Sequence, residues 1–387
     1  MSTAAVTANA LASRAPRVAA ALVALLTLLA GCRPAPRGAA PARLPGEPAA
    51  ATAATGAAAA DSFTNPVVWS QDAGDPWVVR HGGAYYFTAT LDANDGVWVW
   101  KSPTLTGLDS GRKVKVWDAP ESGPISAQIW APELHRLRGT WYLYFTASDG
   151  VDANHRHYVL EAETDDPQGA YKAPVRVDPD VERYAIDGSV LEMPDGRLYF
   201  MYCARDGVFI APMSSPTRVS GPGVNIVTGS EPWERGWRRV GGVWERAPGY
   251  WVEAPEALIR DGRVFIVYSA GHTATPHYYL GLLSLTGTDP LDPKAWRKRR
   301  DPLFGPYEGV DGAVYTPGHN GFAKSPDGTE DWLVYHGKER PWPIQGQRDL
   351  GSRRTVRIQR FTWNTDGTPH FGHPIPSGVR LRKPSGE

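Results

Sequence analysis

The sequence predicts an all-β protein that folds as a five-bladed β-propeller. Aromatic residues are abundant, with Trp 15, Tyr 16 and Phe 10, and they occur beside Gly 41 and Pro 35. Aromatic residues favour strands, and Gly and Pro mark the turns between strands. From residue 62 on there is no long helical periodicity, only short aromatic and β-branched runs separated by turn residues.

A turn followed by an aromatic-rich strand recurs five times along the chain. The copies read HGGAYYFTA, RGTWYLYFTA, DGRLYFMYCA, DGRVFIVYSA and DGTEDWLVYHG. Their turn glycines lie 56, 57, 66 and 66 residues apart and are Gly83, Gly139, Gly196, Gly262 and Gly328. A period of this length is typical of sheets repeated radially around an axis, so five copies predict five blades. A β-sandwich also has turn-separated strands, but it need not repeat at this period.

Three segments are predicted along the chain. In residues 1–32 two arginines precede VAAALVALLTLLAGC, an apolar run that is too short for an ordinary membrane span. The run ends in a sequence that resembles a bacterial lipobox, which predicts a signal peptide and lipidation at Cys32; an ordinary secretory signal is the alternative. Residues 33–61 are rich in Ala, Pro and Gly and are expected to form a disordered tether. Residues 62–387 then form the propeller domain.

These segments predict export and a lipid anchor on a bacterial membrane, facing the periplasm or the exterior. Without lipidation the protein would be secreted. With Cys32 lipidated, Cys203 has no disulfide partner in the chain and is expected to be a small core residue.

The charge balance argues against polyelectrolyte partners. Lys+Arg and Asp+Glu are both 41, so the formal net charge is +0 at pH 7. No excess of either sign points to nucleic acid or to an acidic polymer. We therefore expect a neutral substrate and no nucleic-acid partner.

Each predicted blade carries a polar or aromatic residue at nearly the same place, eight or nine residues before its turn glycine. These residues are Asp75, Trp130, Asp187, Glu253 and His319. The first strand of each propeller blade lines the central axis, so equivalent positions converge on one spot. Glu256 lies three residues after Glu253 and is expected to face the other way, because side chains alternate along a strand. A structural hydrogen bond or ion pair is the role predicted for it.

Three of the converging residues are carboxylic acids, which is sufficient equipment for glycoside hydrolysis. One carboxyl group protonates the leaving oxygen, and another activates water or attacks directly. A third nearby carboxylate raises the pKa of the acid by like-charge repulsion. A single Asp before Pro or Gly is usually part of a turn, so the hypothesis rests on the shared register of Asp75, Asp187 and Glu253.

On these motifs, residues 62–378 resemble glycoside hydrolase family 43, a family of five-bladed β-propellers, and most closely its exo-acting α-L-arabinofuranosidases. The matching motifs, in chain order, are AGDP, WAPE, AIDGSV, EAP and TPGHN. The resemblance implies an inverting reaction in which Asp75 is the general base, Glu253 the general acid and Asp187 the pKa modulator. Two positions depart from the family pattern, since Ala254 and Thr316 stand where it has glycine.

Other groups are expected to shape the pocket. Flat aromatic faces suit the C–H face of a sugar ring, and guanidinium groups donate hydrogen bonds to hydroxyls. The candidate substrate-binding residues are Trp77, Trp98, Trp130, His319 and Arg354. Arg357 is expected on a solvated strand face. The resemblance also places a water-mediated structural calcium ion near His319 as a further expectation, and it requires no cofactor for catalysis.

The implied activity is release of terminal α-L-arabinofuranosyl residues from arabinose-containing plant polysaccharides or oligosaccharides. β-Xylosidase and arabinanase activities on the same scaffold remain open, with xylose- or arabinose-containing substrates. A non-catalytic carbohydrate-binding propeller at the cell surface is the alternative from another class. Three retained carboxyl groups argue against it, because a lectin needs no acid/base pair.

Overall fold

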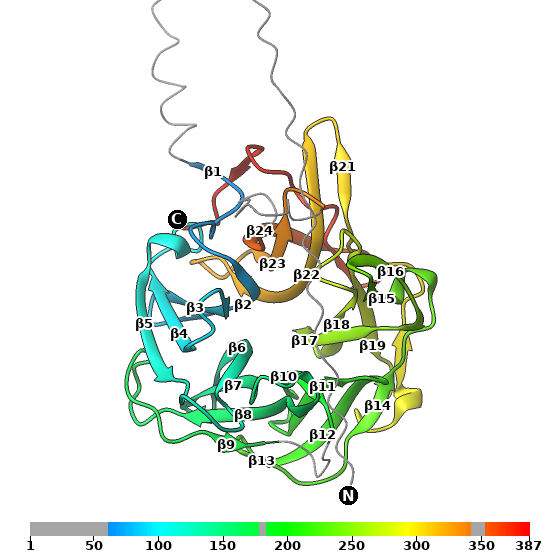
Figure 1. Ribbon diagram of the computed structural model, residues 1–387. Coiled ribbons are helices and arrows are strands. Elements are labelled where there is room, and N and C mark those ends of the chain that lie inside the picture. The colour runs from blue at the N-terminus through cyan, green and yellow to red at the C-terminus, as the bar shows by residue number, and fades with distance from the viewer. Residues whose placement is uncertain (1–60, 178–182, 342–352) are drawn as a thin grey trace, which may run out of the picture. The chain divides into compact units, whose positions relative to one another are not determined.

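The computed structural model describes residues 61–177, 183–341 and 353–387. The predicted signal peptide, Cys32 and nearly all of the predicted tether lie outside these residues. Within them, five antiparallel sheets surround a central axis, each with its first long strand nearest the axis (Figure 1). The predicted all-β, five-bladed propeller is confirmed. No helix in the described ranges is long and apolar enough to cross a membrane.

Blades I to III follow one another along the chain. Blade I contains β2 (Ala73–His81), β3 (Ala84–Leu91), β4 (Gly96–Ser102) and β5 (Arg112–Asp118). Blade II contains β6 (Ala127–Leu137), β7 (Thr140–Ser148), β8 (Arg156–Glu161) and β9 (Val175–Arg176). Blade III contains β10 (Ala185–Glu192), β11 (Leu198–Ala204) and β12 (Gly207–Ser215), with β13 (Arg218–Val219) and β14 (Val224–Val227) both paired to β12.

Blades IV and V complete the ring. Blade IV contains β17 (Val252–Arg260), β18 (Arg263–Gly271), β19 (Tyr278–Leu285) and β20 (Trp296–Lys298). Blade V contains β21 (Tyr307–Gly309), β22 (Gly312–Lys324), β23 (Asp331–Lys338), β24 (Thr355–Trp363) and β25 (Pro369–His370). Two further pairs lie outside the blades: β1 (Ser62–Thr64) with β26 (Arg380–Arg382), and β15 (Arg235–Val240) with β16 (Val243–Tyr250).

The five repeated glycines occupy the hairpins between the first two long strands of each blade. Their φ angles are 78°, 87°, 82°, 75° and 75° at Gly83, Gly139, Gly196, Gly262 and Gly328. This left-handed conformation is readily adopted by glycine and rarely by residues with a Cβ atom. The repeat in the sequence is therefore a repeat of one turn geometry.

The hydrophobic core is divided among the interfaces between blades. One cluster packs Leu191 of β10 against Val264 of β18, and another packs Phe87 of β3 against Val334 of β23. The second of these joins the first blade to the last, so burial of apolar surface closes the ring. The backbone N–H of Val67 adds a hydrogen bond to the carbonyl of Val356 (2.8 Å).

Two expectations about single residues have different outcomes. Cys203 is a buried free cysteine whose Sγ donates to the carbonyl of Val252 (3.1 Å), which confirms its place in the core. The expectation for Arg357 was wrong, since its side chain is 0% exposed. Its guanidinium donates to the carbonyl of Ile375 (3.2 Å) and to Ser377 Oγ (2.9 Å), so the C-terminal segment covers it.

Candidate active site

A cavity of about 560 Å³ lies where the inner strands meet. This volume falls within the range of small-molecule sites, roughly 300–1,000 Å³. Every blade contributes to its walls, and the predicted residues among its lining are Asp75, Trp130, Asp187, Glu253, His319 and Arg354. The three carboxyl groups predicted to converge do line one cavity.

A β-bulge interrupts each inner strand at the axis. The first residue of each bulge has a positive φ: Asp75 54°, Ala131 44°, Asp187 55°, Ala254 50° and His319 44°. The strand pairing shifts register at the same five places. Bulges commonly re-aim side chains beside active sites. Here they turn the axial residues toward the cavity.

The bulges correct the register predicted from the sequence. Glu253 and Trp130 lie one residue before the bulge residue, whereas Asp75, Asp187 and His319 are bulge residues themselves. Counting from the turn glycine cannot resolve this one-residue difference. The backbone explains why the family pattern has glycine at the two departing positions, but not why this chain has other residues there. Ala254 (φ 50°) and Thr316 (φ 59°) adopt a conformation that favours glycine.

A ring of hydrogen bonds holds the bulges in place. In four of the five cases the backbone N–H of the bulge residue donates to a side chain on the second long strand of the preceding blade. The pairs are Asp75 with His336 Nδ1 (3.1 Å), Ala131 with Thr90 Oγ1 (2.8 Å), Asp187 with Thr146 Oγ1 (3.2 Å) and His319 with Ser269 Oγ (2.9 Å).

The fifth case places Asp187 beside Glu253. The position equivalent to Thr90, Thr146, Ser269 and His336 on blade III is Cys203, which lies opposite Ile186. Its Sγ already donates to a carbonyl, and sulfur is a weak acceptor. The N–H of Ala254 donates instead to Asp187 Oδ2 (3.1 Å). Asp187 is thereby tied to the residue that follows Glu253.

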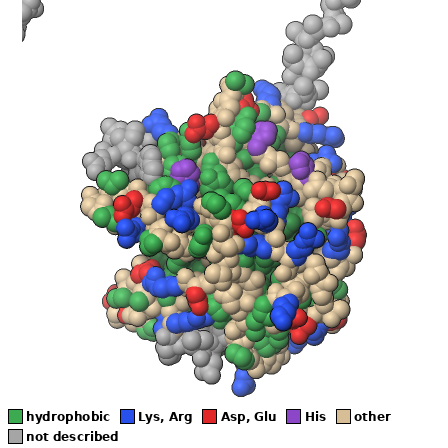
Figure 2. All heavy atoms as spheres, turned by 90° about the vertical axis from the view of Figure 1, so that its right-hand side faces the viewer, with side chains coloured by type: hydrophobic (Ala, Val, Ile, Leu, Met, Phe, Trp, Pro, Cys, Tyr) green, Lys and Arg blue, Asp and Glu red, His purple; other side chains and the backbone are tan. Residues whose placement is uncertain are grey.

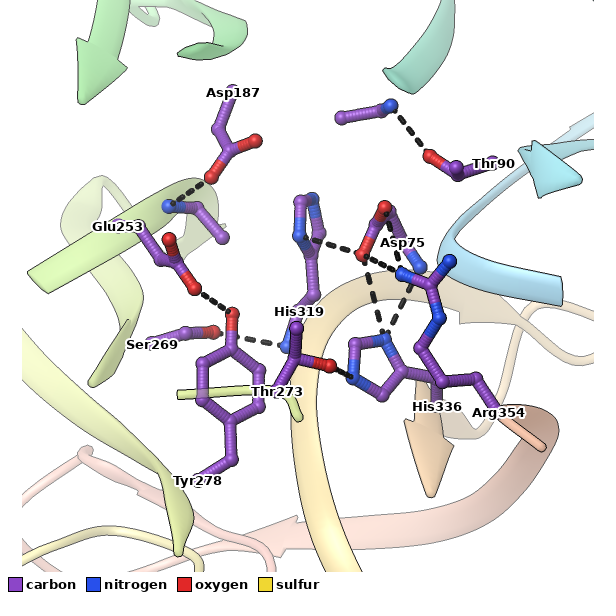
Figure 3. A network of polar contacts seen from close by, with 12 residues as sticks. Asp75, Thr90, Asp187, Glu253, Ser269, Thr273, Tyr278, His319, His336 and Arg354 are labelled. Carbon is purple, nitrogen blue, oxygen red and sulfur yellow. Dashed lines mark hydrogen bonds and ion pairs between the residues drawn. The ribbon is translucent and has the colours of Figure 1, made fainter. Parts of the chain in front are cut away.

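Asp75 is surrounded by positive charge (Figure 3). Both of its carboxylate oxygens accept hydrogen bonds from Arg354 Nη1 (3.2 Å each), and its Oδ1 lies 3.1 Å from His319 Nδ1. Burial alone raises the pKa of Asp75, but Arg354 and then His319 outweigh it and hold the pKa well below 3.8. Asp75 is therefore ionised across the neutral range.

His336 supports Asp75 as a neutral imidazole. Its Nδ1 accepts the N–H of Asp75, so the proton resides on Nε2, which lies 3.0 Å from Thr273 Oγ1. Burial lowers the pKa of His336 well below 6.5, in agreement with this hydrogen-bond pattern. The histidine thus orients the backbone of Asp75 without adding charge.

The other two carboxyl groups hold a proton more readily than ordinary acids. Burial is the largest cause that raises the pKa of Asp187, to about 8, and the charge of Glu253 raises it further. Burial also raises the pKa of Glu253 above 4.5, while Trp251 and Tyr278 partly oppose the shift. The Asp187–Glu253 pair therefore retains a proton near neutral pH.

Glu253 is held at both oxygens. The hydroxyl of Tyr278 donates to Oε1 (2.7 Å), and the indole N–H of Trp251 donates to Oε2. These contacts orient the carboxyl group at the wall of the cavity, where Figure 3 shows it facing the same space as Asp187. The side chain is buried, with an exposed fraction of 8%.

His319 is a cation between these acids. Burial alone lowers its pKa, but the carboxylate of Asp75, and then that of Asp187, more than offset this and raise the pKa to about 9. A protonated His319 compensates the negative charge of Asp75 at the base of the cavity. His319 thus lies at the axis, as predicted, and there it forms an ion pair with the carboxylate of Asp75.

Glu256 lies outside the cavity lining and is buried beside Glu133. Burial raises the pKa of Glu256 well above 4.5, and Glu133 raises it further. Glu133 in turn lies 2.7 Å from His135 Nε2. Glu256 therefore belongs to a buried polar cluster, in which its Oε2 has no hydrogen-bond partner among the described residues, and its predicted structural role stays a prediction.

Two of the three candidate tryptophans are placed elsewhere. Trp130 lines the cavity and stacks on His155 with ring centroids 4.2 Å apart. The cavity lining contains neither Trp77 nor Trp98. The indole of Trp77 donates to the carbonyl of Leu134 (2.8 Å), and that of Trp98 donates to Asp95 (3.1 Å). Both rings serve packing between strands, so their assignment to substrate is corrected.

Arg354 reaches the cavity, but its polar partners are carboxylates. Besides contacting Asp75, its Nε donates to Asp72 Oδ1 (3.0 Å). These contacts give Arg354 an electrostatic role toward Asp75, and its predicted role as a sugar-hydroxyl donor stays a prediction. Gly74 allows this approach, because a Cβ atom at that position would lie 1.9 Å from Arg354 Nη1.

Several cavity residues were not predicted from the sequence. Tyr278 comes from the third strand of blade IV, and His272 and Thr273 follow β18. The β15–β16 pair also contributes to the wall. Its turn, Gly241-Gly242, has φ angles of 56° and 87° and is the two-glycine signal of a tight hairpin. That signal was available in the sequence.

The calcium expectation stays a prediction. In the described ranges no group of three or more His, Cys, Asp and Glu side chains is arranged to hold a metal ion. Calcium prefers six to eight oxygen ligands. The oxygens of Asp75 beside His319 are already engaged with cations. A calcium ion near His319 would therefore depend mainly on water.

Comparison with known proteins assigns the family. The model of glycosyl hydrolases family 43 matches residues 63–369. The extracellular exo-α-(1→5)-L-arabinofuranosidase of Streptomyces avermitilis is 34% identical over 86% of this chain and 68% of its own. α-L-Arabinofuranosidase B of Pyricularia oryzae is 31% identical over 83% of this chain and 66% of its own. The chain thus spans about two thirds of the length of these relatives.

A solved structure agrees with this assignment. The crystal structure of α-L-arabinofuranosidase from Lactobacillus brevis is 30% identical, with a TM-score of 0.71. The match covers 82% of this chain and 98% of that one. With its propeller fold, its axial carboxyl groups and a family match over most of its length, the chain belongs to glycosyl hydrolases family 43.

Proposed function

We propose that this glycoside hydrolase is an inverting exo-α-L-arabinofuranosidase. It would release terminal arabinofuranosyl residues from arabinose-containing oligosaccharides or polysaccharides. The observation that carries the proposal is the contrast in protonation around one cavity. Asp75 is held ionised, whereas the Asp187–Glu253 pair retains a proton. The names of the relatives from Streptomyces, Pyricularia and Lactobacillus support the choice of sugar.

Asp75 would act as the general base. Its low pKa keeps it ready to accept a proton from water that attacks the anomeric carbon. Arg354 and His319 hold the carboxylate in place and would stabilise it before the proton arrives. Such a base is weak, so positioning of the water must supply part of the rate.

Glu253 would act as the general acid. Tyr278 and Trp251 fix the direction of its carboxyl group, and burial favours its protonated form. When the glycosidic bond breaks, the proton passes from Glu253 to the departing oxygen. Asp187, bound to the N–H of Ala254, would hold Glu253 protonated as the pKa modulator.

The location of the protein is part of the proposal. The Streptomyces relatives are named extracellular, which supports export of this chain. We infer lipid anchoring from the lipobox-like sequence at Cys32. Replacing Cys32 with Ser should release the protein from the membrane fraction, whereas an ordinary secretory signal predicts no change in fractionation.

The activity is tested with two aryl substrates. We expect hydrolysis of p-nitrophenyl α-L-arabinofuranoside and much slower hydrolysis of p-nitrophenyl β-D-xyloside. NMR of the first turnover should show a product with inverted anomeric configuration, because a water molecule attacks directly. A preference for the xyloside would replace the arabinofuranosidase by a xylosidase. Hydrolysis of neither substrate would favour a non-catalytic carbohydrate-binding propeller.

A further inference from the structure

The β15–β16 hairpin is an addition to the propeller at the edge of the cavity. It forms its own two-stranded sheet, enters after blade III and runs through Trp251 directly into β17, which carries Glu253. In Figure 1 it lies beside blade IV. Several of its residues line the cavity: Gly236, Trp237, Ala247, Gly249 and Tyr250.

Contacts with blade IV hold the hairpin in a defined position. Trp237 stacks on His277 with ring centroids 5.0 Å apart and an interplanar angle of 4°. The guanidinium of Arg246 lies 4.5 Å from the centre of the Trp237 ring. Trp244 contacts His272, a cavity residue, at 4.5 Å between ring centroids. The hairpin is therefore a braced wall of the site.

The chemistry of the acid defines which part of the substrate this wall faces. A general acid protonates the oxygen of the leaving group, so the leaving group lies on the side of Glu253. Trp251 follows the hairpin without interruption and donates its indole N–H to Glu253. The hairpin consequently borders the leaving-group side of the cavity.

Tyr250 is the aromatic residue of the hairpin that is most exposed to solvent. It lines the cavity and is 38% exposed, and the guanidinium of Arg235 lies 6.0 Å from its ring centre. An accessible aromatic face at a cavity mouth suits the apolar C–H face of a sugar. The rings of Trp237 and Trp244, in contrast, are already engaged with histidines.

We propose that the β15–β16 hairpin forms the subsite for the leaving group, with Tyr250 as the platform on which the next sugar unit stacks. The ligand is a neutral arabino-oligosaccharide, and the inference rests on the proposed arabinofuranosidase function. Figure 2 views the side of the molecule that carries blade IV and shows hydrophobic side chains interspersed with Lys and Arg.

The experiment compares a substrate that reaches the subsite with one that does not. The first is a short α-(1→5)-linked arabino-oligosaccharide, the linkage named for the Streptomyces relative. The second is methyl α-L-arabinofuranoside, whose methyl group is too small to stack on Tyr250. The variants are Tyr250→Ala and Tyr250→Phe. Val243→Ala is the control, because Val243 is a 69% exposed hairpin residue outside the cavity lining.

We expect Tyr250→Ala to raise KM for the oligosaccharide roughly tenfold, the upper end of what an aromatic contact contributes. The kcat value should change little, and hydrolysis of the methyl glycoside should stay near wild type. Tyr250→Phe should retain oligosaccharide binding, because the apolar ring is what stacks. Val243→Ala should match wild type on both substrates.

Two results would overturn the subsite. Equal losses on both substrates would mean that Tyr250 supports the fold of the site, and unchanged KM for the oligosaccharide would mean that the sugar does not contact it. Inactivity of the wild type on every arabinofuranoside is a separate outcome. It would refute the proposed function, and the subsite with it, before any variant is compared.

Discussion

The guanidinium of Arg354 lies 3.2 Å from both carboxylate oxygens of Asp75. The same guanidinium contacts Asp72 at 3.0 Å, so the carboxylates of Asp72 and Asp75 are linked through Arg354. Burial lowers the pKa of Arg354, but Asp75 and then Asp72 outweigh it and raise the pKa above its ordinary value. The arrangement sets the charge of the proposed base, and its consequences are measurable as pH profiles.

Replacing Arg354 with Gln should shift the acidic limb of kcat/KM to higher pH. A neighbouring cation favours the carboxylate, so its loss raises the pKa of Asp75, by about 1–3 units for a close pair. Activity at weakly acidic pH would fall more than activity at neutral pH. Arg360→Gln is the control, because Arg360 lies on β24, the strand that begins directly after Arg354, and pairs with Glu330 away from the cavity. An unmoved acidic limb would contradict the electrostatic role.

Gly74→Ala should reproduce this shift without touching a charged residue. The new Cβ atom would lie 1.9 Å from Arg354 Nη1 and 2.0 Å from its Cζ. The end of a flexible side chain can move aside, so we expect the protein to stay folded while Arg354 leaves Asp75. A melting temperature near wild type together with an acidic limb at higher pH would support this; a normal pH profile would show that the contact survives.

Glu253→Gln and Asp75→Asn should differ in their dependence on the leaving group. Both should lose roughly 10²–10⁴ in kcat/KM on natural linkages, the usual worth of general acid–base catalysis. A 2,4-dinitrophenolate leaves without protonation, so Glu253→Gln should recover much of its rate on the dinitrophenyl arabinofuranoside. Asp75→Asn still lacks a base and should not recover. Equal behaviour of the two variants on this substrate would argue against the assigned roles.

The blades and the axial acids were accessible from the sequence because one local signal repeats. Each turn glycine has a positive φ, and each acid lies on the strand just before that turn. The bulges could not be predicted from the sequence, because a one-residue shift in strand pairing leaves no mark in the order of the amino acids. Trp130 and Glu253 were therefore placed one residue out of register with Asp75.

Side chains whose position depends on packing between blades were also beyond sequence reasoning. His336 and Tyr278 come from second and third strands, and only the assembled ring brings them to Asp75 and Glu253. Trp77 and Trp98 show the reverse error, because an indole suits core packing and a sugar platform equally well. In the structure the indole N–H groups of Trp77 and Trp98 donate to neighbouring strands and turns, which places both rings in the packing rather than at the sugar.

Cys203→Ser should move the alkaline limb of kcat/KM to higher pH. Its hydroxyl would stand where Thr90, Thr146 and Ser269 stand in other blades and would accept the N–H of Ala254. Asp187 would then lose a hydrogen bond that lowers its pKa, and the acid pair would hold its proton longer. Cys203→Ala, which offers no acceptor, is the control and should leave the limb in place. If the alkaline limb moved equally in both variants, the shift could not come from transfer of the Ala254 N–H from Asp187 to the new hydroxyl.

Asp187→Asn should stabilise the fold while it impairs catalysis. The folded-state pKa of Asp187 is raised from 3.8 to about 8. A group with a raised pKa contributes its full stability below the unfolded value, and the contribution is lost as pH rises through the folded value. Wild type should therefore lose stability between about pH 4 and 8 relative to Asn, which does not titrate and still accepts the N–H of Ala254. Melting temperatures across this range should show a difference that grows with pH and then levels off. A difference that shrinks with pH would mean that Asp187 is ionised in the folded protein, so that it is not the group that stores the shared proton.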